Sequence, residues 1–92
     1  MAKVANVQKA IFKTEGFGVV IRHYNKKDVH DNKEGLPLYR YSKAAPNSMT
    51  VTGWKTGRFR KRYTGFDIDV LDASNGKVDG RTLLRNVRAT YR

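Results

Sequence analysis

Two kinds of hydrophobic pattern run along this chain, and the commoner one is typical of β-strands. In residues 66–71, Phe66, Ile68 and Val70 fall on one face and Asp67, Asp69 and Leu71 on the other. Residues 49–54 alternate in the same way, and the pattern resumes at 58–63 after a turn at 55–57. The β-rich run 19–24 indicates a buried strand. We therefore expect an antiparallel sheet of about four or five strands.

Several segments predict shorter elements and turns. Val4, Val7 and Ile11 fit one face of a helix, but the β-branched residues also permit a strand, so residues 4–12 are compatible with either. Residues 38–41 are compatible with a short strand, and residues 44–48 around Pro46 with a turn. Asn75 followed by glycine is a strong signal for a tight turn.

The second pattern, at the C-terminus, predicts a helix. Thr82 is a suitable N-cap residue, and Leu84, Val87 and Tyr91 recur at helical spacing. The opposite side carries a stripe of basic residues: Arg81, Arg85, Arg88 and Arg92. We expect a single α+β domain over residues 1–92, with this helix packed on the sheet.

Charge changes the picture from fold to function. The 92 residues hold 19 lysines and arginines against 8 aspartates and glutamates, a net charge of +11. Residues 50–65 contribute five cations and no acid, residues 81–92 four more, and the stretch between them is acidic. Such an excess attracts polyanions, and basic patches mark proteins that bind nucleic acid. We expect nucleic acid, RNA in preference to DNA, as the partner.

The segment 54–63 is the first candidate site because it interleaves aromatic residues with cations. As a strand it would present a row of three guanidinium groups at intervals of about 7 Å, suited to phosphates, with aromatic faces available for stacking on bases. The predicted nucleic-acid contacts are Trp54, Lys55, Arg58, Arg60, Lys61 and Arg62 here, and Arg85, Arg88 and Arg92 in the C-terminal stripe. For that stripe, pairing with the helix dipole or with the acidic face of Asp67, Asp69 and Asp72 is an equal alternative.

A polar segment of alternating charge is the second candidate site. Residues 25–34 read as a loop or a short solvent-facing helix. The residues expected to contact a protein or ribonucleoprotein partner are Asn25, Lys26, Lys27, Asp28, His30, Asp31, Asn32, Lys33 and Glu34. A merely solvated loop is the competing interpretation.

Catalytic chemistry finds little support in the residue pattern. Asp67, Asp69 and Asp72 could gather a magnesium ion for a nuclease, but no acid–base partner stands beside them. The chain has no cysteine, and its two histidines lack metal-binding spacing. We expect no catalysis, no metal or other cofactor and no small-molecule substrate. The absence of a long apolar run or a secretory signal predicts a cytoplasmic protein without a membrane partner.

The chain is a small, motif-poor domain with many surface charges, and its distinctive parts are the 25–34 loop, the Arg58–Arg62 row and the segment 82–91. In these respects it resembles the phage-encoded inhibitors of CRISPR surveillance complexes, the anti-CRISPR proteins. The resemblance is one of type. Many such proteins look acidic and imitate DNA, whereas this chain is basic. The resemblance therefore implies binding to Cas proteins and guide RNA in a host cell, which would block hybridisation of target DNA. A general accessory protein for RNA or single-stranded DNA is the alternative, and a metal-dependent nuclease a weaker one.

Overall fold

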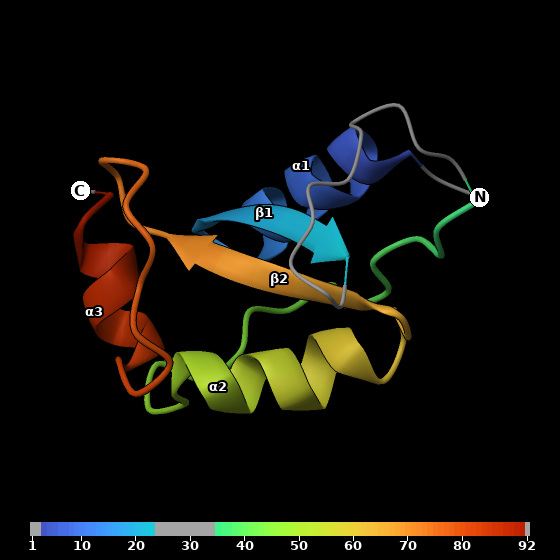
Figure 1. Cartoon of the computed structure of the whole chain (residues 1–92). Coiled ribbons are helices and arrows are strands. Elements are labelled where there is room, and N and C mark those ends of the chain that lie inside the picture. The colour runs from blue at the N-terminus through green and yellow to red at the C-terminus, as the bar shows by residue number, and fades with distance from the viewer. Residues whose placement is uncertain (1–2, 24–34, 92) are drawn as a thin grey trace.

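The computed structural model describes residues 3–23 and 35–91 and has an α+β fold, as predicted (Figure 1). Helix α1 (Val4–Glu15) is followed by strand β1 (Gly18–His23). Helix α2 (Val51–Trp54) runs directly into the π-helical segment η1 (Lys55–Arg60). Strand β2 (Phe66–Leu71) and the short helix α3 (Leu84–Ala89) complete the fold.

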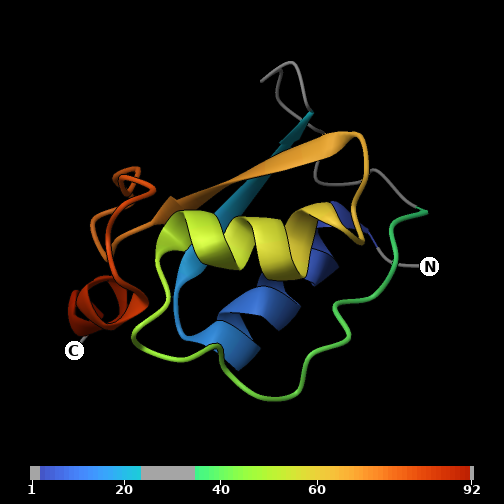
Figure 2. The same ribbon diagram turned by 90° about the horizontal axis from the view of Figure 1, so that it is seen from below.

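The sheet has two antiparallel strands in the described part of the chain, rather than four or five. Val19 lies opposite Val70, and Ile21 lies opposite Ile68. All four are buried, so this pair of strands has one face on the core and one facing outward. The strands predicted at 19–24, as far as residue 23, and at 66–71 are confirmed. In Figure 2 the strands lie on one side of the helices, and residues 35–49 run along the opposite side.

The strands predicted at 49–54 and 58–63 are wrong, because this stretch is helical. The Thr50 hydroxyl accepts a hydrogen bond from the Gly53 amide (3.0 Å) and caps α2. Buried residues then recur at Val51, Trp54, Phe59 and Tyr63, and the five-residue step between Trp54 and Phe59 coincides with the π-helical turn. A π-helical turn accommodates one extra residue, so both aromatic side chains stay on the core side.

Helix α1 settles the open choice for residues 4–12 in favour of a helix. Its buried positions are Val4, Val7, Ile11 and Glu15, spaced by three and four residues. It ends at Gly16, whose φ of 84° suits glycine because a Cβ atom is strained there. The apolar face of α1 thus extends to a carboxylate at its C-terminal end.

The C-terminal helix is confirmed in part. It spans only six residues, Leu84–Ala89, and Leu83 rather than Thr82 occupies the N-cap, without a side-chain hydrogen bond. The Thr82 carbonyl instead accepts from the Val51 amide (2.9 Å), which ties the start of α2 to the chain before α3. None of the helices in the described ranges has the length and apolarity that a membrane span requires.

The turn predictions hold, but the short strand at 38–41 does not form. Asn75 adopts a φ of 65°, and the Asp72 carbonyl accepts from its amide (3.0 Å). The Met49 amide donates to the Pro46 carbonyl (3.0 Å), closing the second turn. Residues 38–41 belong to an irregular segment that crosses the molecule on the side opposite the sheet (Figure 2). Because it has no backbone ladder, other groups must satisfy its polar atoms.

Candidate nucleic-acid interface

The predicted row of arginines does not exist, because helical geometry turns Arg60 away from Arg58 and Arg62. Arg58 reaches inward to Glu15 (2.8 Å), and Arg60 pairs with Asp67 (3.3 Å). Arg62 donates from Nε to the Leu38 carbonyl (2.8 Å). A strand would have aligned the three guanidinium groups on one face. In a helix, residues two positions apart point in nearly opposite directions, because each residue adds a rotation of about 100°.

Trp54 also differs from its predicted role. Its side chain is fully buried, so it has no face available to a base. The ring meets Phe17 edge-on, with centroids 5.1 Å apart, and its Nε1 donates to the Tyr39 hydroxyl (3.3 Å). Of the other predicted residues in this stretch, Lys61 is exposed and Lys55 is half-buried, with its charge acting on Asp67.

The arginine stripe of the C-terminus is likewise divided. Arg85 is exposed, but Arg88 turns inward and pairs with Glu15 (3.2 Å). Of the two alternatives that the sequence left open, pairing of Arg88 with the acidic face of the sheet does not occur, whereas Arg88 does lie in the last turn of α3, where the helix dipole acts. Arg92 and the whole 25–34 loop lie outside the described residues.

Glu15 is the centre of a buried network that the sequence interpretation missed. Its side chain is completely inaccessible, and one oxygen, Oε2, accepts from Arg58 (2.8 Å) and from the Tyr39 hydroxyl (2.5 Å). The other, Oε1, accepts from the Ala45 amide (2.8 Å) and from Arg88 (3.2 Å). A signal was present, since Glu15 continues the 4, 7, 11 spacing of the buried face, and a carboxylate at such a position needs buried partners.

This network holds residues 37–47 in place without secondary structure. Arg58 donates to the Lys43 carbonyl (2.6 Å), and Arg88 donates to the Ala45 carbonyl (2.8 Å). Tyr63 and Arg62 bind the carbonyls of residues 37 and 38, and Thr14 binds that of residue 41. The missing backbone ladder is thus replaced by side chains from α1, from η1 and the residues just after it, and from α3. Several of the predicted nucleic-acid contacts therefore have a structural role.

The environment of Tyr39 changes the pKa of its hydroxyl. Burial raises the pKa of the Tyr39 hydroxyl, and the hydrogen bond to Glu15 and the charge of that carboxylate raise it further. The hydroxyl therefore remains protonated and keeps donating to Glu15 well above the ordinary tyrosine pKa.

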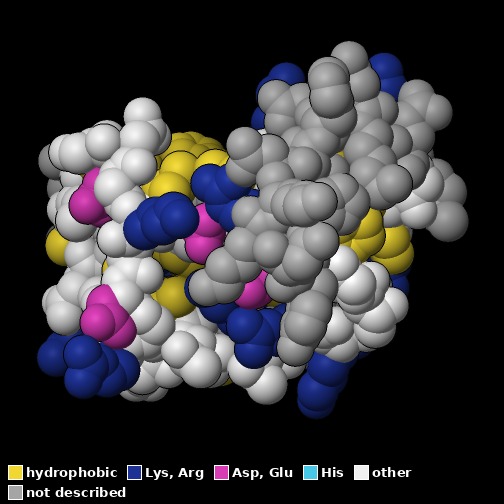
Figure 3. Space-filling model, in the orientation of Figure 1, with side chains coloured by type: hydrophobic (Ala, Val, Ile, Leu, Met, Phe, Trp, Pro, Cys, Tyr) yellow, Lys and Arg dark blue, Asp and Glu magenta, His cyan; other side chains and the backbone are white. Residues whose placement is uncertain are grey.

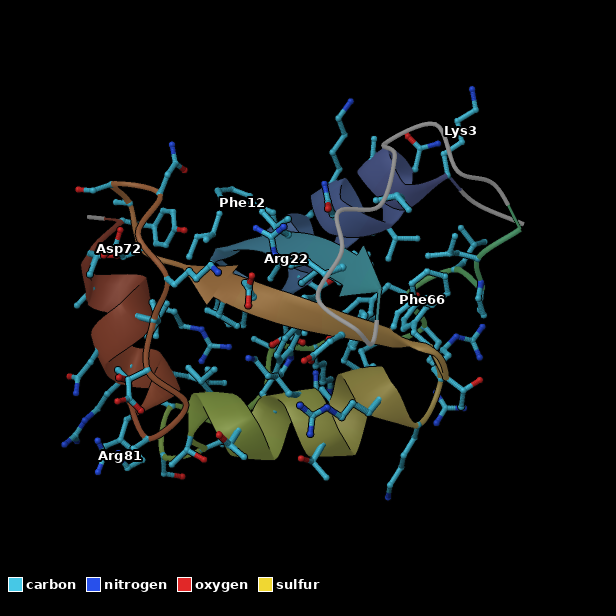
Figure 4. All side chains as sticks on the ribbon, viewed as in Figure 1. Lys3, Phe12, Arg22, Phe66, Asp72 and Arg81 are labelled. Carbon is cyan, nitrogen blue, oxygen red and sulfur yellow. The ribbon has the colours of Figure 1, made fainter. Side chains whose placement is uncertain are left out.

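The outer face of the sheet is electrically balanced. Asp69 accepts from Arg22 (2.5 Å) and lies 3.6 Å from Lys77. Beside the sheet, in the loop between β2 and α3, Arg81 pairs with Asp79 (3.2 Å). Asp72 accepts from the amides of Ser74 and Gly76, which closes its turn. Figure 3 shows the acidic side chains of this face set among lysines and arginines, and Figure 4 labels Arg22, Asp72 and Arg81. With the Arg60–Asp67 pair, four cations pair with three carboxylates.

A different group of cations surrounds the 35–49 segment. We call it the basic face, and its members are exposed residues from α1, from the segment itself and from α3: Lys13, Arg40, Lys43 and Arg85. Arg40 points outward because its neighbours Tyr39 and Tyr41 pack toward the core. None of the four has a carboxylate partner within residues 3–23 and 35–91. Only Arg85 among them was predicted as a site residue.

The aspartates do not form a metal centre. Asp67, Asp69 and Asp72 are engaged with cations or backbone amides as described above, and no group of three or more potential ligands gathers within the described part of the chain. Comparisons of the chain with family models, with curated proteins and with solved structures find no match.

Proposed function

We propose that this protein is a non-catalytic binder of nucleic acid, RNA in preference to DNA, and that the basic face contacts phosphates. The observation that carries the proposal is the uneven compensation of charge. Four cations on or beside the sheet pair with carboxylates, whereas Lys13, Arg40, Lys43 and Arg85 are exposed and have no carboxylate partner in the described structure. Unpaired cations neutralise phosphates and release the counterions condensed on them.

The Glu15 network supports this proposal by fixing where the cations stand. Arg40 and Lys43 belong to an irregular segment, and a flexible segment would pay a conformational entropy cost on binding. Arg58 and Arg88 hold the backbone of that segment at residues 43 and 45. Two arginines predicted to touch nucleic acid therefore serve the proposed site indirectly, by positioning the residues that touch it.

The resemblance to inhibitors of CRISPR surveillance complexes gives a narrower form of the proposal. In that form the nucleic acid is the guide RNA of a complex with Cas proteins, and binding blocks target DNA hybridisation. Much tighter binding to the assembled complex than to naked RNA or DNA would support this form. Equal binding to naked strands would support a general accessory protein. Magnesium-dependent cleavage that is lost in Asp69→Ala would contradict both.

The general proposal is tested by removing three cations from one face at a time. The triple variant Arg40→Gln, Lys43→Gln, Arg85→Gln is compared with a control of equal charge change, Arg60→Gln, Lys77→Gln, Arg81→Gln. Fluorescence anisotropy with labelled single-stranded RNA is measured over a range of salt concentrations. We expect the first variant to lower the salt slope by about 2, at about 0.7 per lost phosphate contact, and the control to change it much less. Equal losses in both variants, or no binding by the parent protein, would contradict the proposal.

A further inference from the structure

A hollow of about 360 Å³ lies between α1 and the start of β1, outside the basic face. Its lining combines small, aromatic and basic residues: Ala5, Gln8, Lys9, Phe12, Gly18 and Val19. Phe12 is 49% exposed, which is unusual for so large an apolar side chain in a small core. Figure 4 labels Phe12 at this junction. The volume is at the lower end of the range of small-molecule sites.

The Phe12 ring is held in place although half of it faces solvent. Tyr91 meets it edge-on, with ring centroids 5.7 Å apart. The Tyr91 hydroxyl is itself fixed, since it accepts from the Gly18 amide (2.8 Å) and donates to the Leu71 carbonyl (2.6 Å). An exposed aromatic face that a hydrogen-bonded neighbour holds in place is pre-organised for stacking, because little side-chain entropy remains to be lost.

The edges of the hollow are polar and basic. Gln8 accepts from the Ile21 amide through Oε1 (2.9 Å), which leaves its amide N–H groups as donors beside the hollow. Lys9 lines the hollow, and Lys13 follows one helical turn later on the exposed side of α1. In the described part of the chain neither lysine has a carboxylate partner.

The hollow and the basic face are neighbours across α1. Thr14 faces the 35–49 segment, because its hydroxyl donates to the Tyr41 carbonyl (3.3 Å). Phe12 faces the start of β1, on the other flank of the helix. With 100° between successive residues, Lys13 falls between these two directions on the solvent side. A chain of phosphates that leaves the basic face over Lys13 therefore arrives at the hollow.

We infer that this hollow accepts an unpaired base of a single-stranded nucleic acid, which stacks on Phe12 while Lys9 and Lys13 contact the flanking phosphates. The inference rests on the proposed function and makes it more specific, since it distinguishes single strands from duplexes. A paired base inside a duplex offers no free face to Phe12, whereas stacking on unpaired bases contributes to binding without reading sequence.

The test compares Phe12→Leu with the parent protein on three probes of equal length: a single-stranded RNA, its duplex, and a strand with abasic sites. Leucine keeps an apolar contact with Tyr91 but has no ring to stack. We expect an affinity loss of about 5- to 150-fold for the single strand. Affinity for the duplex and the abasic strand, and the salt slope for all probes, should stay unchanged. A second variant, Ala5→Leu, fills the hollow while retaining Phe12 and every charge, and should reproduce the loss.

The possible outcomes separate this inference from the proposal beneath it. If the parent protein binds none of the probes, the proposed function is wrong. If it binds all three equally, and Phe12→Leu and Ala5→Leu leave affinity for the single strand unchanged, the function stands and the base site is wrong. Circular dichroism and thermal unfolding of both variants show whether the fold is retained, and Lys9→Gln should lower the salt slope for single strands by about 0.7.

Discussion

Ion pairs occur in two settings in this molecule, and the settings differ in what the pairing does. Around Glu15, a fully buried carboxylate pairs with two arginines whose side chains are only 16–18% exposed. In the loop between β2 and α3, by contrast, the Arg81–Asp79 pair has side chains that are 93% and 59% exposed. Exposed pairs contribute about 0–1 kcal/mol, whereas unpairing a buried charge costs several times more. The first setting therefore holds segments together, and the second mainly cancels charge.

The comparison also explains why so strongly basic a chain has a defined basic face. The carboxylates of residues 66–80 neutralise the cations that stand beside them on the sheet. Glu15 pairs with two arginines that hold the backbone of the 35–49 segment. Within residues 3–23 and 35–91, the cations around that segment keep their charge for a partner.

The largest expected effect on stability comes from removing the buried ion pairs of Glu15. Glu15→Gln retains the shape of the side chain but leaves two inward-facing arginines beside an uncharged amide. We expect a loss of about 3 kcal/mol in the free energy of unfolding, which corresponds to a fall in Tm of roughly 12–24 °C for a domain of this size. Urea and thermal unfolding provide the measurement. The matched control is Asp79→Asn, which breaks the exposed pair with Arg81 and should cost far less, and similar losses in the two variants would contradict the comparison.

Sequence patterns predicted the α+β class and both strands because a half-buried strand has a simple period of two, as in Ile68 and Val70. They failed at 49–63 because the π-helical turn shifts the helical spacing between Trp54 and Phe59 to five residues. A local sequence window does not reveal that shift, since it depends on aromatic packing against the rest of the core.

The candidate site was harder to predict than the fold. Charge counts identified a basic protein but could not tell Arg88, which turns inward, from Arg85, which stays exposed on the same short helix. That difference depends on where Glu15 lies, and Glu15 is 73 residues away along the chain from Arg88. Contacts over such separations are set by the tertiary fold, which periodicity does not encode.

An intermediate effect on stability is expected at alkaline pH, and it depends on Tyr39 in the buried Glu15 network. Burial, followed by the hydrogen bond and charge of Glu15, raises the pKa of Tyr39 above its ordinary value. The unfolded chain loses this proton near pH 10 while the folded protein retains it. The contribution is therefore fully present below about pH 10 and is lost as pH rises toward the folded pKa, by at most about 1.4 kcal/mol per pH unit.

The measurement is urea unfolding between pH 8 and pH 11 for the parent protein and for Tyr39→Phe. Phenylalanine cannot titrate, so its variant should start less stable and decline less steeply with pH. Every other ionisable residue is the same in the two proteins, which makes the difference between the two curves specific to Tyr39. Parallel curves would show that Tyr39 does not differ in pKa between the folded and unfolded states.

The smallest effect is expected from the sheet. Burial acts to raise the pKa of Asp67, but the hydrogen bonds from the Ile68 amide and from Arg60, with the charges of Arg60 and Lys55, outweigh it, so the pKa lies below its ordinary value. A lowered pKa contributes stability above the unfolded value of about 3.9, and that contribution is lost as pH falls through the folded value. Asp67→Asn should therefore cost less than about 1 kcal/mol at pH 7 and flatten the acid limb of the stability profile.

Asp67→Asn also sharpens the difference between the two faces in binding. It adds one net positive charge, as any loss of a carboxylate does, but on the balanced sheet rather than beside Arg40 and Lys43. Exposed charges farther apart than about 8 Å are largely screened at physiological ionic strength. Affinity for single-stranded RNA at that ionic strength should therefore change by less than about twofold. If the gain in binding free energy reaches about one third of the loss in the basic-face triple variant, which removes three charges, net charge alone would govern binding, and the position of the cations would be irrelevant.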